Sequence, residues 1–303
     1  MWLQKIDMPT ICVIALGLML SPVSAQEWKS GVEWSEPPLV TPGVTDDAAP
    51  SDAIVLFDGT NLDAWEGGEK WLIEDGVAIP RETEIRTKQH FGDIQLHVEW
   101  TAPTEIRGAG QGRGNSGIYL MGQYEVQVLD SFENATYFDG QAGSIYKQTA
   151  PLANAMRKPG EWNSYDIVFT APSFKSNGDL VMPGYVTLIQ NGVLLLNHFE
   201  LQGSTGYVSA PRYVPHAESG PISLQFHGDA VKFRNVWLRE IKPAVGRRTG
   251  LPFNIEPKTK DEPKEGEKAD SENEKPKAES AEDKKDDASP DKEKTPHLQG
   301  RSE

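Results

Sequence analysis

Short runs of apolar residues, many of them β-branched or aromatic, follow one another from about residue 54 to residue 241. The run from Tyr124 to Val128 is the clearest, because every second residue is apolar while Glu125 and Gln127 occupy the positions between. Successive side chains of a β-strand point to opposite faces of the sheet, so this alternation predicts a strand with one apolar and one polar face.

Nine further segments show a similar texture, and no stretch between them has the longer period of an amphipathic helix. Many short strands separated by turn residues predict an all-β sandwich of two antiparallel sheets. The segments are Ile54 to Phe57, Trp71 to Ile73, Ile94 to Trp100, Ser116 to Met121, Tyr165 to Thr170, Tyr185 to Ile189, Val193 to Phe199, Ile222 to His227 and Val231 to Glu240.

Two turns between these runs are specific enough to predict hairpins. Asn191-Gly192 separates two apolar runs by two residues, and Asn-Gly accepts the positive φ angles of a type I′ turn. Met121-Gly122-Gln123 joins the run that begins at Ser116 to the run that begins at Tyr124. The stretch from Asn115 to Asp130 is therefore predicted to form one β-hairpin.

Three predicted strands carry two polar residues on the face opposite their apolar residues. A concave sheet would bring such faces into one groove, whereas an ordinary solvated sheet face is the alternative. Both interpretations stay open for these pairs, which are Glu125 with Gln127, His97 with Glu99, and Gln225 with His227.

Two polar residues flank the predicted hairpin. Asn115 precedes its first strand and is expected either to fix the preceding loop or to reach the groove. Asp130 ends its second strand and is expected to cap the following turn or to bind a structural cation. The glycine-rich stretch from Gly108 to Gly114 lacks the strand-then-helix context of a nucleotide loop, so we interpret it as a flexible loop.

Aromatic residues near these strands are candidates for stacking on sugar rings, although burial in the core is the expected role of most of them. Trp237 alternates in phase with Phe233 and is predicted to lie in the core, while Arg234 on the other face is available to a carboxylate. The stacking candidates are Trp65, Trp71, Tyr119, Tyr146, Trp162 and Tyr207.

The formal net charge of -15 disfavours nucleic acid and anionic membranes as partners, because binding to them requires clustered Lys and Arg. His97, His198, His216 and His227 are scattered and do not have the spacing of zinc ligands. The sequence thus predicts no metal and no cofactor.

Both ends of the chain differ from its middle. Lys5, the apolar run from Ile11 to Leu20, and Val23-Ser24-Ala25 form the pattern of a cleaved signal peptide over residues 1–25. The protein is therefore expected to be secreted or periplasmic, with no membrane insertion after cleavage and no disulfide, since its one cysteine precedes the cleavage site. Residues 26–51 read as an extended lead-in, and residues 256–303 as a disordered charged tail.

Several motifs, in order over residues 52–243, resemble the 3-keto-disaccharide hydrolase domain family. The resemblance implies a concanavalin-like jelly-roll sandwich and cleavage of glycosidic bonds in sugars whose C3 hydroxyl is oxidised to a ketone. The motifs are LFDGTNLDAWEG (Leu56 to Gly67), HVEW (His97 to Trp100), GNSGIYLMGQYEVQVLDS (Gly114 to Ser131), GSIY (Gly143 to Tyr146), EWNSYDIVF (Glu161 to Phe169) and GPISLQFHGDAVKFRNVWLREI (Gly220 to Ile241).

A ketone at C3 acidifies the C2 hydrogen, so a base can start a β-elimination that expels the anomeric group, after which water adds to the enone. For such a route, Glu125 and His227 are expected to be the base and the acid, in either order. Glu99 is the third candidate, and a position across the groove from Glu125 would favour a hydrolysis with two carboxylates instead. The expected substrate-binding residues are Asn115, Gln127, Gln225, Tyr146 and Trp162. A non-catalytic glycan-binding module is the alternative function.

Overall fold

The structure, a computed structural model, describes residues 28–250. The predicted signal peptide and the predicted charged tail lie outside the described residues. Within residues 28–250 no helix is long and apolar enough to cross a membrane. The helices of this part are single 3-10 turns, namely η1 (Gly68–Lys70), η2 (Gly110–Gly112) and η3 (Phe138–Gly140).

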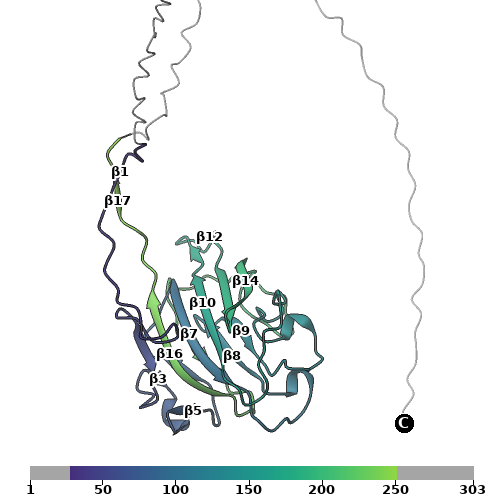
Figure 1. The fold of residues 1–303 in the computed structure, drawn as a ribbon. Helices are drawn as coiled ribbons and strands as arrows, with labels where there is room; N and C mark the ends of the chain where they lie inside the picture. Colours follow the sequence, from purple (N-terminus) through teal and green to yellow (C-terminus); the bar gives the residue numbers. More distant parts are fainter. Residues whose placement is uncertain (1–27, 251–303) are drawn as a thin grey trace, which may run out of the picture. The chain divides into compact units, whose positions relative to one another are not determined.

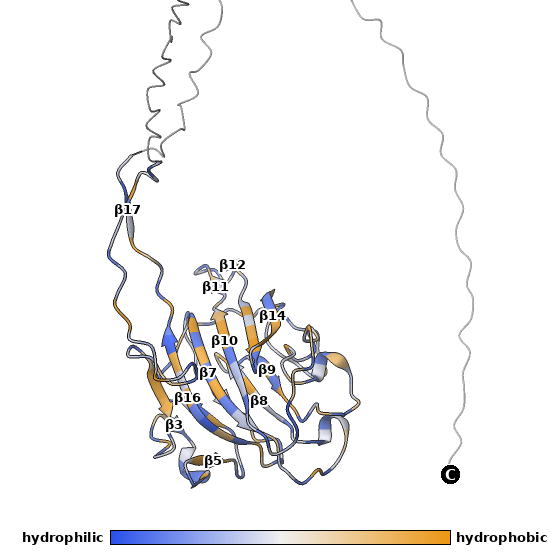
Figure 2. Ribbon diagram, viewed as in Figure 1, coloured by the Kyte–Doolittle hydropathy of each residue, from blue (hydrophilic) through white to orange (hydrophobic). Residues whose placement is uncertain are grey.

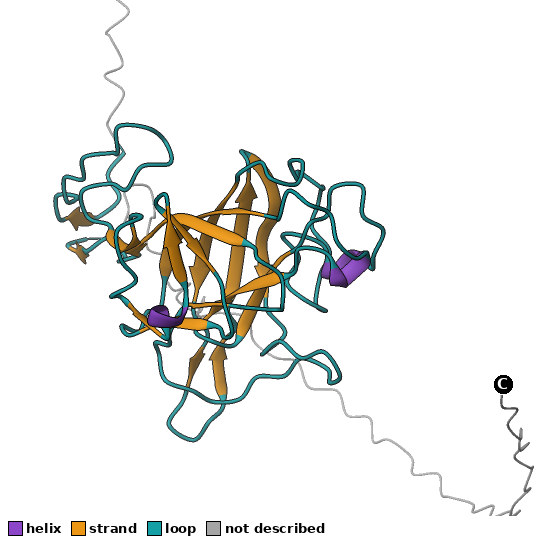
Figure 3. Cartoon of the chain, turned by 90° about the horizontal axis from the view of Figure 1, so that it is seen from below, coloured by secondary structure: helices purple, strands orange, loops and turns teal. Residues whose placement is uncertain are grey.

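Two antiparallel sheets contain most of the strands (Figures 1 and 3). The larger sheet has the order β14 (Val193–Glu200), β13 (Tyr185–Gln190), β10 (Asn163–Thr170), β7 (Ile94–Thr101), β16 (Lys232–Glu240), β5 (Val77–Ile79) and β4 (Leu72–Glu74), and β2 (Ile54–Phe57) also pairs with β16. The smaller sheet has the order β3 (Trp65–Glu66), β6 (Ile85–Thr87), β15 (Ser223–Leu224), β8 (Ser116–Leu120) and β9 (Tyr124–Val128).

Two further strand pairs lie outside these sheets. They are β1 (Val32–Trp34) with β17 (Gly246–Arg248), and β11 (Ser173–Phe174) with β12 (Leu180–Met182). β7 and β10 are neighbours in the larger sheet, although the hairpin of β8 and β9 that lies between them in sequence belongs to the smaller one. The chain therefore crosses between two packed sheets, and the fold is the jelly-roll sandwich that the sequence predicts.

A single hydrophobic core joins the inner faces of both sheets. Apolar side chains of β7, β10 and β16 pack there against those of β8 and β9. In Figure 2 the strands accordingly carry hydrophobic segments interrupted by polar ones. The residues between the core positions face outward, so His97 and Glu99 of β7 lie on one outer face of the sandwich. Glu125 and Gln127 of β9 lie on the opposite outer face.

Both predicted hairpins are present. Gln190 pairs with Val193 across Asn191 and Gly192, whose φ angles of 51° and 81° are those of a type I′ turn. Leu120 pairs with Tyr124 across the second turn, and Met121 and Gly122 there also have positive φ angles. The register of the second hairpin places Tyr119 directly opposite Glu125.

Trp237 is buried as predicted, at 4% exposed, but the prediction that it shares a face with Phe233 is wrong, and a β-bulge in β16 is the reason. The register of β16 against β7 shifts between Arg234 and Trp237, where Asn235 has a φ of 45°. One extra residue reverses the facing of every later side chain, so the Trp237 ring stacks on His97 on the outer face. Its indole donates to the Asp47 carbonyl at 3.0 Å, which docks the lead-in against this sheet.

Candidate active site

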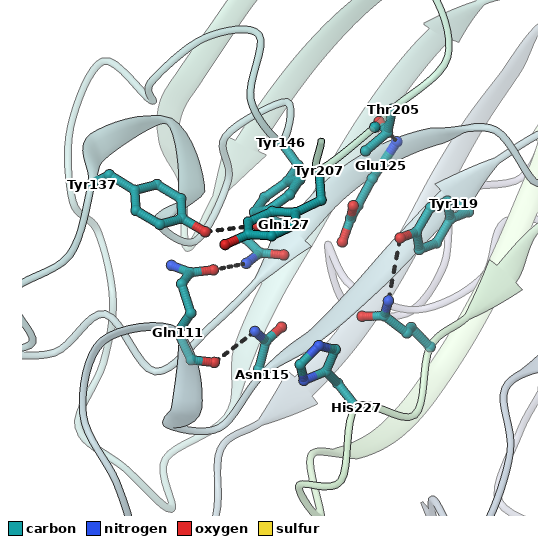
Figure 4. A pocket seen from close by; sticks show the side chains of 12 residues that line it. Gln111, Asn115, Tyr119, Glu125, Gln127, Tyr137, Tyr146, Thr205, Tyr207 and His227 are labelled. Carbon is teal, nitrogen blue, oxygen red and sulfur yellow. Dashed lines mark hydrogen bonds between the residues drawn. The ribbon is translucent and has the colours of Figure 1, made fainter. Parts of the chain in front are cut away.

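A cavity of about 620 Å³ lies on the outer face of the smaller sheet. β8 and β9 form its floor, and its walls come from the glycine-rich loop, the chain that follows β9 and the loop after β14 (Figure 4). Its lining residues are Gln111, Asn115, Tyr119, Glu125, Gln127, Tyr137, Tyr146, Thr205, Gly206, Tyr207, Gln225 and His227.

Glu125 is the one carboxylate among the described residues that line this cavity. Its side chain leaves β9 on the face opposite the core and is only 4% exposed. Gly117 on the neighbouring strand gives the carboxylate room, because a Cβ at residue 117 would lie 2.6 Å from Glu125 Oε1. Burial raises the pKa of Glu125 to about 7, and a hydrogen bond from the Tyr119 hydroxyl only partly offsets the rise.

Amide side chains line the floor beside this carboxylate. Gln127 Nε2 lies 3.0 Å from Gln111 Oε1. With its amide turned over, the Gln127 nitrogen instead donates to Glu125 Oε1 at 3.2 Å. Asn115 Nδ2 donates to the Gln111 carbonyl at 2.7 Å, so Asn115 both fixes the loop and reaches the cavity. These amides offer donors and acceptors suited to sugar hydroxyls.

Gln225 and His227 enter the cavity from the chain after β15. The Gln225 amide N–H donates to the Gly117 carbonyl at 2.9 Å, which extends the pairing with β8 beyond the end of β15. The Gln225 side chain donates to the Tyr119 hydroxyl at 3.2 Å. His227 is exposed. Figure 4 shows the imidazole and the carboxylate of Glu125 facing the same open space. A buried carboxylate and an exposed imidazole therefore share one hollow.

Two tyrosines form the wall opposite Tyr119. The hydroxyls of Tyr137 and Tyr146 lie 2.6 Å apart, and the Lys147 ammonium lies 3.2 Å from the centre of the Tyr137 ring. Burial and the Tyr137 hydroxyl raise the pKa of Tyr146, so this phenol stays protonated and can donate. Lys147 also lies 3.6 Å from Asp139, which neutralises its charge near the cavity wall.

The structure brings together most of the site residues that the sequence predicts. Glu125, Gln127, Gln225 and His227 converge as expected, although they come from separate segments. Asn115 and Tyr146 join them. The polar pair on β9 is thus part of a groove and not of a solvated sheet face.

Glu99 is a correction, because it lies on the opposite face of the sandwich. Its carboxylate accepts from Arg234 Nε at 2.6 Å and from Asn235 Nδ2 at 2.8 Å. Burial would raise the pKa of Glu99, but these bonds and the nearby His97 lower it to about 2. Glu99 is therefore a charged partner within a polar network and does not face Glu125.

His97 belongs to the same network. Its Nδ1 lies 2.7 Å from Asp166 Oδ1, while its Nε2 is 3.8 Å from Glu99 Oε1, too far for a hydrogen bond. Burial would lower the pKa of His97, but the two carboxylates raise it to about 9. The polar pair on β7 thus forms part of a charged layer on the sheet surface.

Trp162 is the second correction among the predicted site residues. The Arg234 guanidinium stacks on its ring at 4.1 Å, so Trp162 lies beside Glu99 and away from the cavity. Trp65 and Trp71 are buried, and their indoles donate to the carbonyls of Leu56 and Thr83. Of the six stacking candidates, the three tyrosines line the cavity and the three tryptophans do not.

Asp130 caps a turn and also forms an ion pair. Its Oδ1 accepts from the Phe132 amide at 3.2 Å, and its Oδ2 accepts from Arg113 Nε at 2.7 Å. Among the described residues, no cluster of three or more His, Cys, Asp and Glu side chains has the arrangement of a metal site.

Sequence reasoning missed four lining residues: Gln111, Tyr137, Thr205 and Gly206. The glycine-rich loop holds Gln111 in place, because the Asn134 side chain accepts from the Gly110 amide at 2.8 Å and donates to the Gly110 carbonyl at 3.0 Å. The flexible loop expected there is thus pinned. The one signal in the sequence for any of these residues was the position of Gln111 between glycines.

An all-β sandwich with one buried carboxylate in a polar, tyrosine-lined cavity defines a jelly-roll protein with an enzyme-like site. The profile of the 3-keto-alpha-glucoside-1,2-lyase-like domain family matches residues 52–239, and the chain belongs to this family. The resemblance seen in the motifs is thereby confirmed. The described domain is accordingly glycoside hydrolase-like.

One solved structure agrees with this assignment. A candidate glycosyl hydrolase from Parabacteroides distasonis is 52% identical, with a TM-score of 0.66, over 69% of this chain and 94% of that protein. Two more candidate glycosyl hydrolases from the same organism are 23% and 22% identical, each with a TM-score of 0.47. They cover 63% and 62% of this chain, and 94% and 99% of their own. No protein of curated function matches the chain.

Proposed function

We propose that this protein cleaves the glycosidic bond of 3-keto-glycosides by β-elimination, with Glu125 as the base. Glu125 is the only carboxylate among the described cavity-lining residues, and this observation carries the proposal. Hydrolysis by the usual glycosidase routes uses two carboxylates placed across the bond. Glu99, the other candidate, lies on the far side of the sandwich.

The first step removes the C2 proton. The carboxylate of Glu125 takes this proton, and the electrons of the C2–H bond move into an enolate whose negative charge rests on the C3 oxygen. A pKa of about 7 suits this task, since the group is a stronger base than an ordinary glutamate and is still ionised in part at neutral pH. The ketone makes the step possible.

The second step breaks the glycosidic bond. The enolate electrons return to form a double bond between C1 and C2, and the leaving oxygen departs from C1 with a proton from the imidazolium form of His227. The products are a 1,2-unsaturated 3-keto sugar and the free alcohol of the leaving group. Addition of water across the double bond would then give the 3-keto sugar.

The developing charge on the C3 oxygen needs donors. Gln225 and Asn115 carry amide donors on the cavity floor, and each has a second N–H beyond the one already bonded. Donors fixed in a buried site stabilise an oxyanion more than water does, because they need no reorganisation during the reaction. Gln127 and Tyr146 are placed to bind the remaining sugar hydroxyls.

The direct test is turnover of 3-keto-trehalose by the purified protein, with and without deuterium at C2 of the keto ring. Elimination predicts a primary isotope effect on kcat/KM and a product that absorbs in the ultraviolet as an enone. Release of sugar with no isotope effect and no solvent exchange at C2 would instead indicate displacement at C1.

The alternative function, a glycan-binding module, is tested by the same sample. Binding of the sugar without any release of product, over a panel of 3-keto-glycosides, would replace the enzymatic proposal. The signal-peptide pattern of residues 1–25 supports action outside the cytoplasm, which we include in the proposal.

A further inference from the structure

The loop after β14 is held firmly at its base and touches the strand that carries Glu125. The Thr205 amide donates to the Gln123 carbonyl at 2.9 Å, and Thr205 Oγ1 accepts from the Glu125 amide at 3.0 Å. The Ser204 amide donates to the Arg212 carbonyl at 3.1 Å, which closes the loop. Residues 206–211 are thus anchored beside the cavity at both ends of the loop.

The tip of this loop offers an aromatic ring at the cavity mouth. Tyr207 lines the cavity although 73% of its surface is exposed. Neither its hydroxyl nor its backbone forms a hydrogen bond within residues 28–250. In Figure 4 its ring is seen against Tyr146, on the side of the cavity opposite Tyr119. The Tyr207 side chain thus offers a large apolar face with a polar tip to a molecule that enters the cavity.

We propose that Tyr207 is the platform on which the leaving group of the glycoside stacks, and that it selects substrates whose leaving group is itself a sugar ring. This inference rests on the proposed function and assigns Tyr207 a role in specificity. The apolar C–H face of a pyranose would pack against the exposed phenol ring.

Glu125 lies on the cavity floor and Tyr207 at the cavity mouth. This difference in depth assigns the platform to the leaving group. Proton removal requires C2 of the keto ring to contact Glu125, which is 4% exposed and lies on the cavity floor. With the keto ring seated on this floor, the second ring of a disaccharide, attached at C1, would extend toward the cavity mouth. Tyr207 is the exposed aromatic residue of the mouth, so it meets the group at C1 and not the reacting ring.

The test compares two substrates that differ only in the leaving group. 3-keto-trehalose carries a second pyranose, whereas a methyl 3-keto-α-glucoside offers no ring to stack. Tyr207→Ala should raise KM for 3-keto-trehalose about five- to tenfold, with less than a twofold change in kcat. The methyl substrate should show less than a twofold change in either constant.

Two further variants make the test specific to stacking. Tyr207→Phe keeps the ring and should retain the wild-type KM for both substrates. Val208→Ala changes the neighbouring residue, which is 92% exposed and does not line the cavity, and should also leave both values unchanged. Equal KM changes for the two substrates, or none in Tyr207→Ala, would overturn the platform while the proposed reaction stands.

A wild-type protein that turns over neither substrate would refute the proposed function, and Tyr207 would then be judged by binding alone. Calorimetric titration with 3-keto-trehalose should show weaker binding to Tyr207→Ala than to Tyr207→Phe. Equal affinities, or no binding by the wild type, would reject the platform as well.

Discussion

Glu99 and Glu125 are both buried glutamates on outward faces of the same sandwich, and their pKa values shift in opposite directions. Glu99 is 6% exposed and Glu125 is 4% exposed, so burial alone does not separate them. Glu99 accepts from Arg234 and Asn235 beside His97, and its pKa falls to about 2. Glu125 has the Tyr119 hydroxyl as a donor but no cationic partner, and its pKa rises to about 7.

This contrast shows that donors decide the role of a buried carboxylate. A glutamate with cationic partners is permanently ionised and too weak a base for catalysis. One that lacks them retains affinity for a proton and can exchange it near neutral pH. The face with Glu99 therefore holds the sheet surface together, while the face with Glu125 is suited to chemistry.

Replacing each glutamate by glutamine should show the largest difference between Glu125 and Glu99. Glu125→Gln keeps the shape but removes the base, and we expect kcat for a 3-keto-glycoside to fall about a thousandfold. Glu99→Gln is the matched control and should retain kcat within about twofold. Steady-state kinetics measures both, and a comparable loss in the two variants would contradict the assignment of roles.

The pH dependence of the free energy of unfolding should show the next largest difference between Glu125 and Glu99. The pKa of Glu125 rises from 4.5 to about 7 on folding, so its contribution to stability is complete below pH 4.5 and is lost as the pH rises through 7. Glu125→Gln should therefore be more stable than the wild type at pH 8, by roughly 3 kcal/mol at most. Urea unfolding at pH 4.5 and pH 8 measures the difference, which should nearly vanish at the lower pH.

The ionisation of Glu125 that lowers the stability of the protein should raise its activity. Only the carboxylate form of Glu125 can accept the C2 proton, so kcat/KM should rise with pH through about 7. A pH profile that is flat between 5 and 9 would show that another group is the base.

Gly117 tests whether the position of the Glu125 carboxylate matters. Gly117→Ala places a methyl group 2.6 Å from Glu125 Oε1, so the carboxylate must move, and we expect kcat to fall about thirtyfold. Gly112→Ala is the control, because no atom lies within 4 Å of the added Cβ. Unfolding curves of both variants would identify any loss that comes from folding.

The smallest effect concerns Glu99. Its pKa falls from 4.5 to about 2 on folding, so its contribution is present above pH 4.5 and is lost as the pH falls through 2. The Arg234 side chain is 42% exposed and solvent screens the pair, so Glu99→Gln should cost only about 1–2 kcal/mol at pH 7. Thermal unfolding at pH 7 measures this, and a more stable variant would show that the network does not contribute.

Local alternation carried most of the information about the fold. The run from Tyr124 to Val128 and the Asn191-Gly192 turn are determined by residues close in sequence, and both appear as predicted. Trp237 could not be placed in this way, because its facing depends on the bulge at Asn235. The alternation of apolar and polar residues along one strand does not reveal a bulge, because a bulge is defined by the pairing with the partner strand.

The candidate site was predictable only in part for a related reason. Three strands had the same polar pattern, yet sequence does not say which sheet each strand joins. β7 and β10 belong to the larger sheet, so Glu99 on β7 and Trp162 directly before β10 lie far from Glu125. Gln111, Tyr137 and Thr205 come from loops whose positions depend on bonds such as that between Thr205 and the Glu125 amide.

The pairing of β1 with β17 has a practical use in protein engineering. Val32 and Arg248 are partners in this ladder, so two points near the ends of the described chain are adjacent. A short linker could join them, and new termini could be opened at the Asn191-Gly192 turn. Such a circular permutant would leave both strands of the cavity floor uninterrupted, which makes the domain suitable for insertion into a host protein.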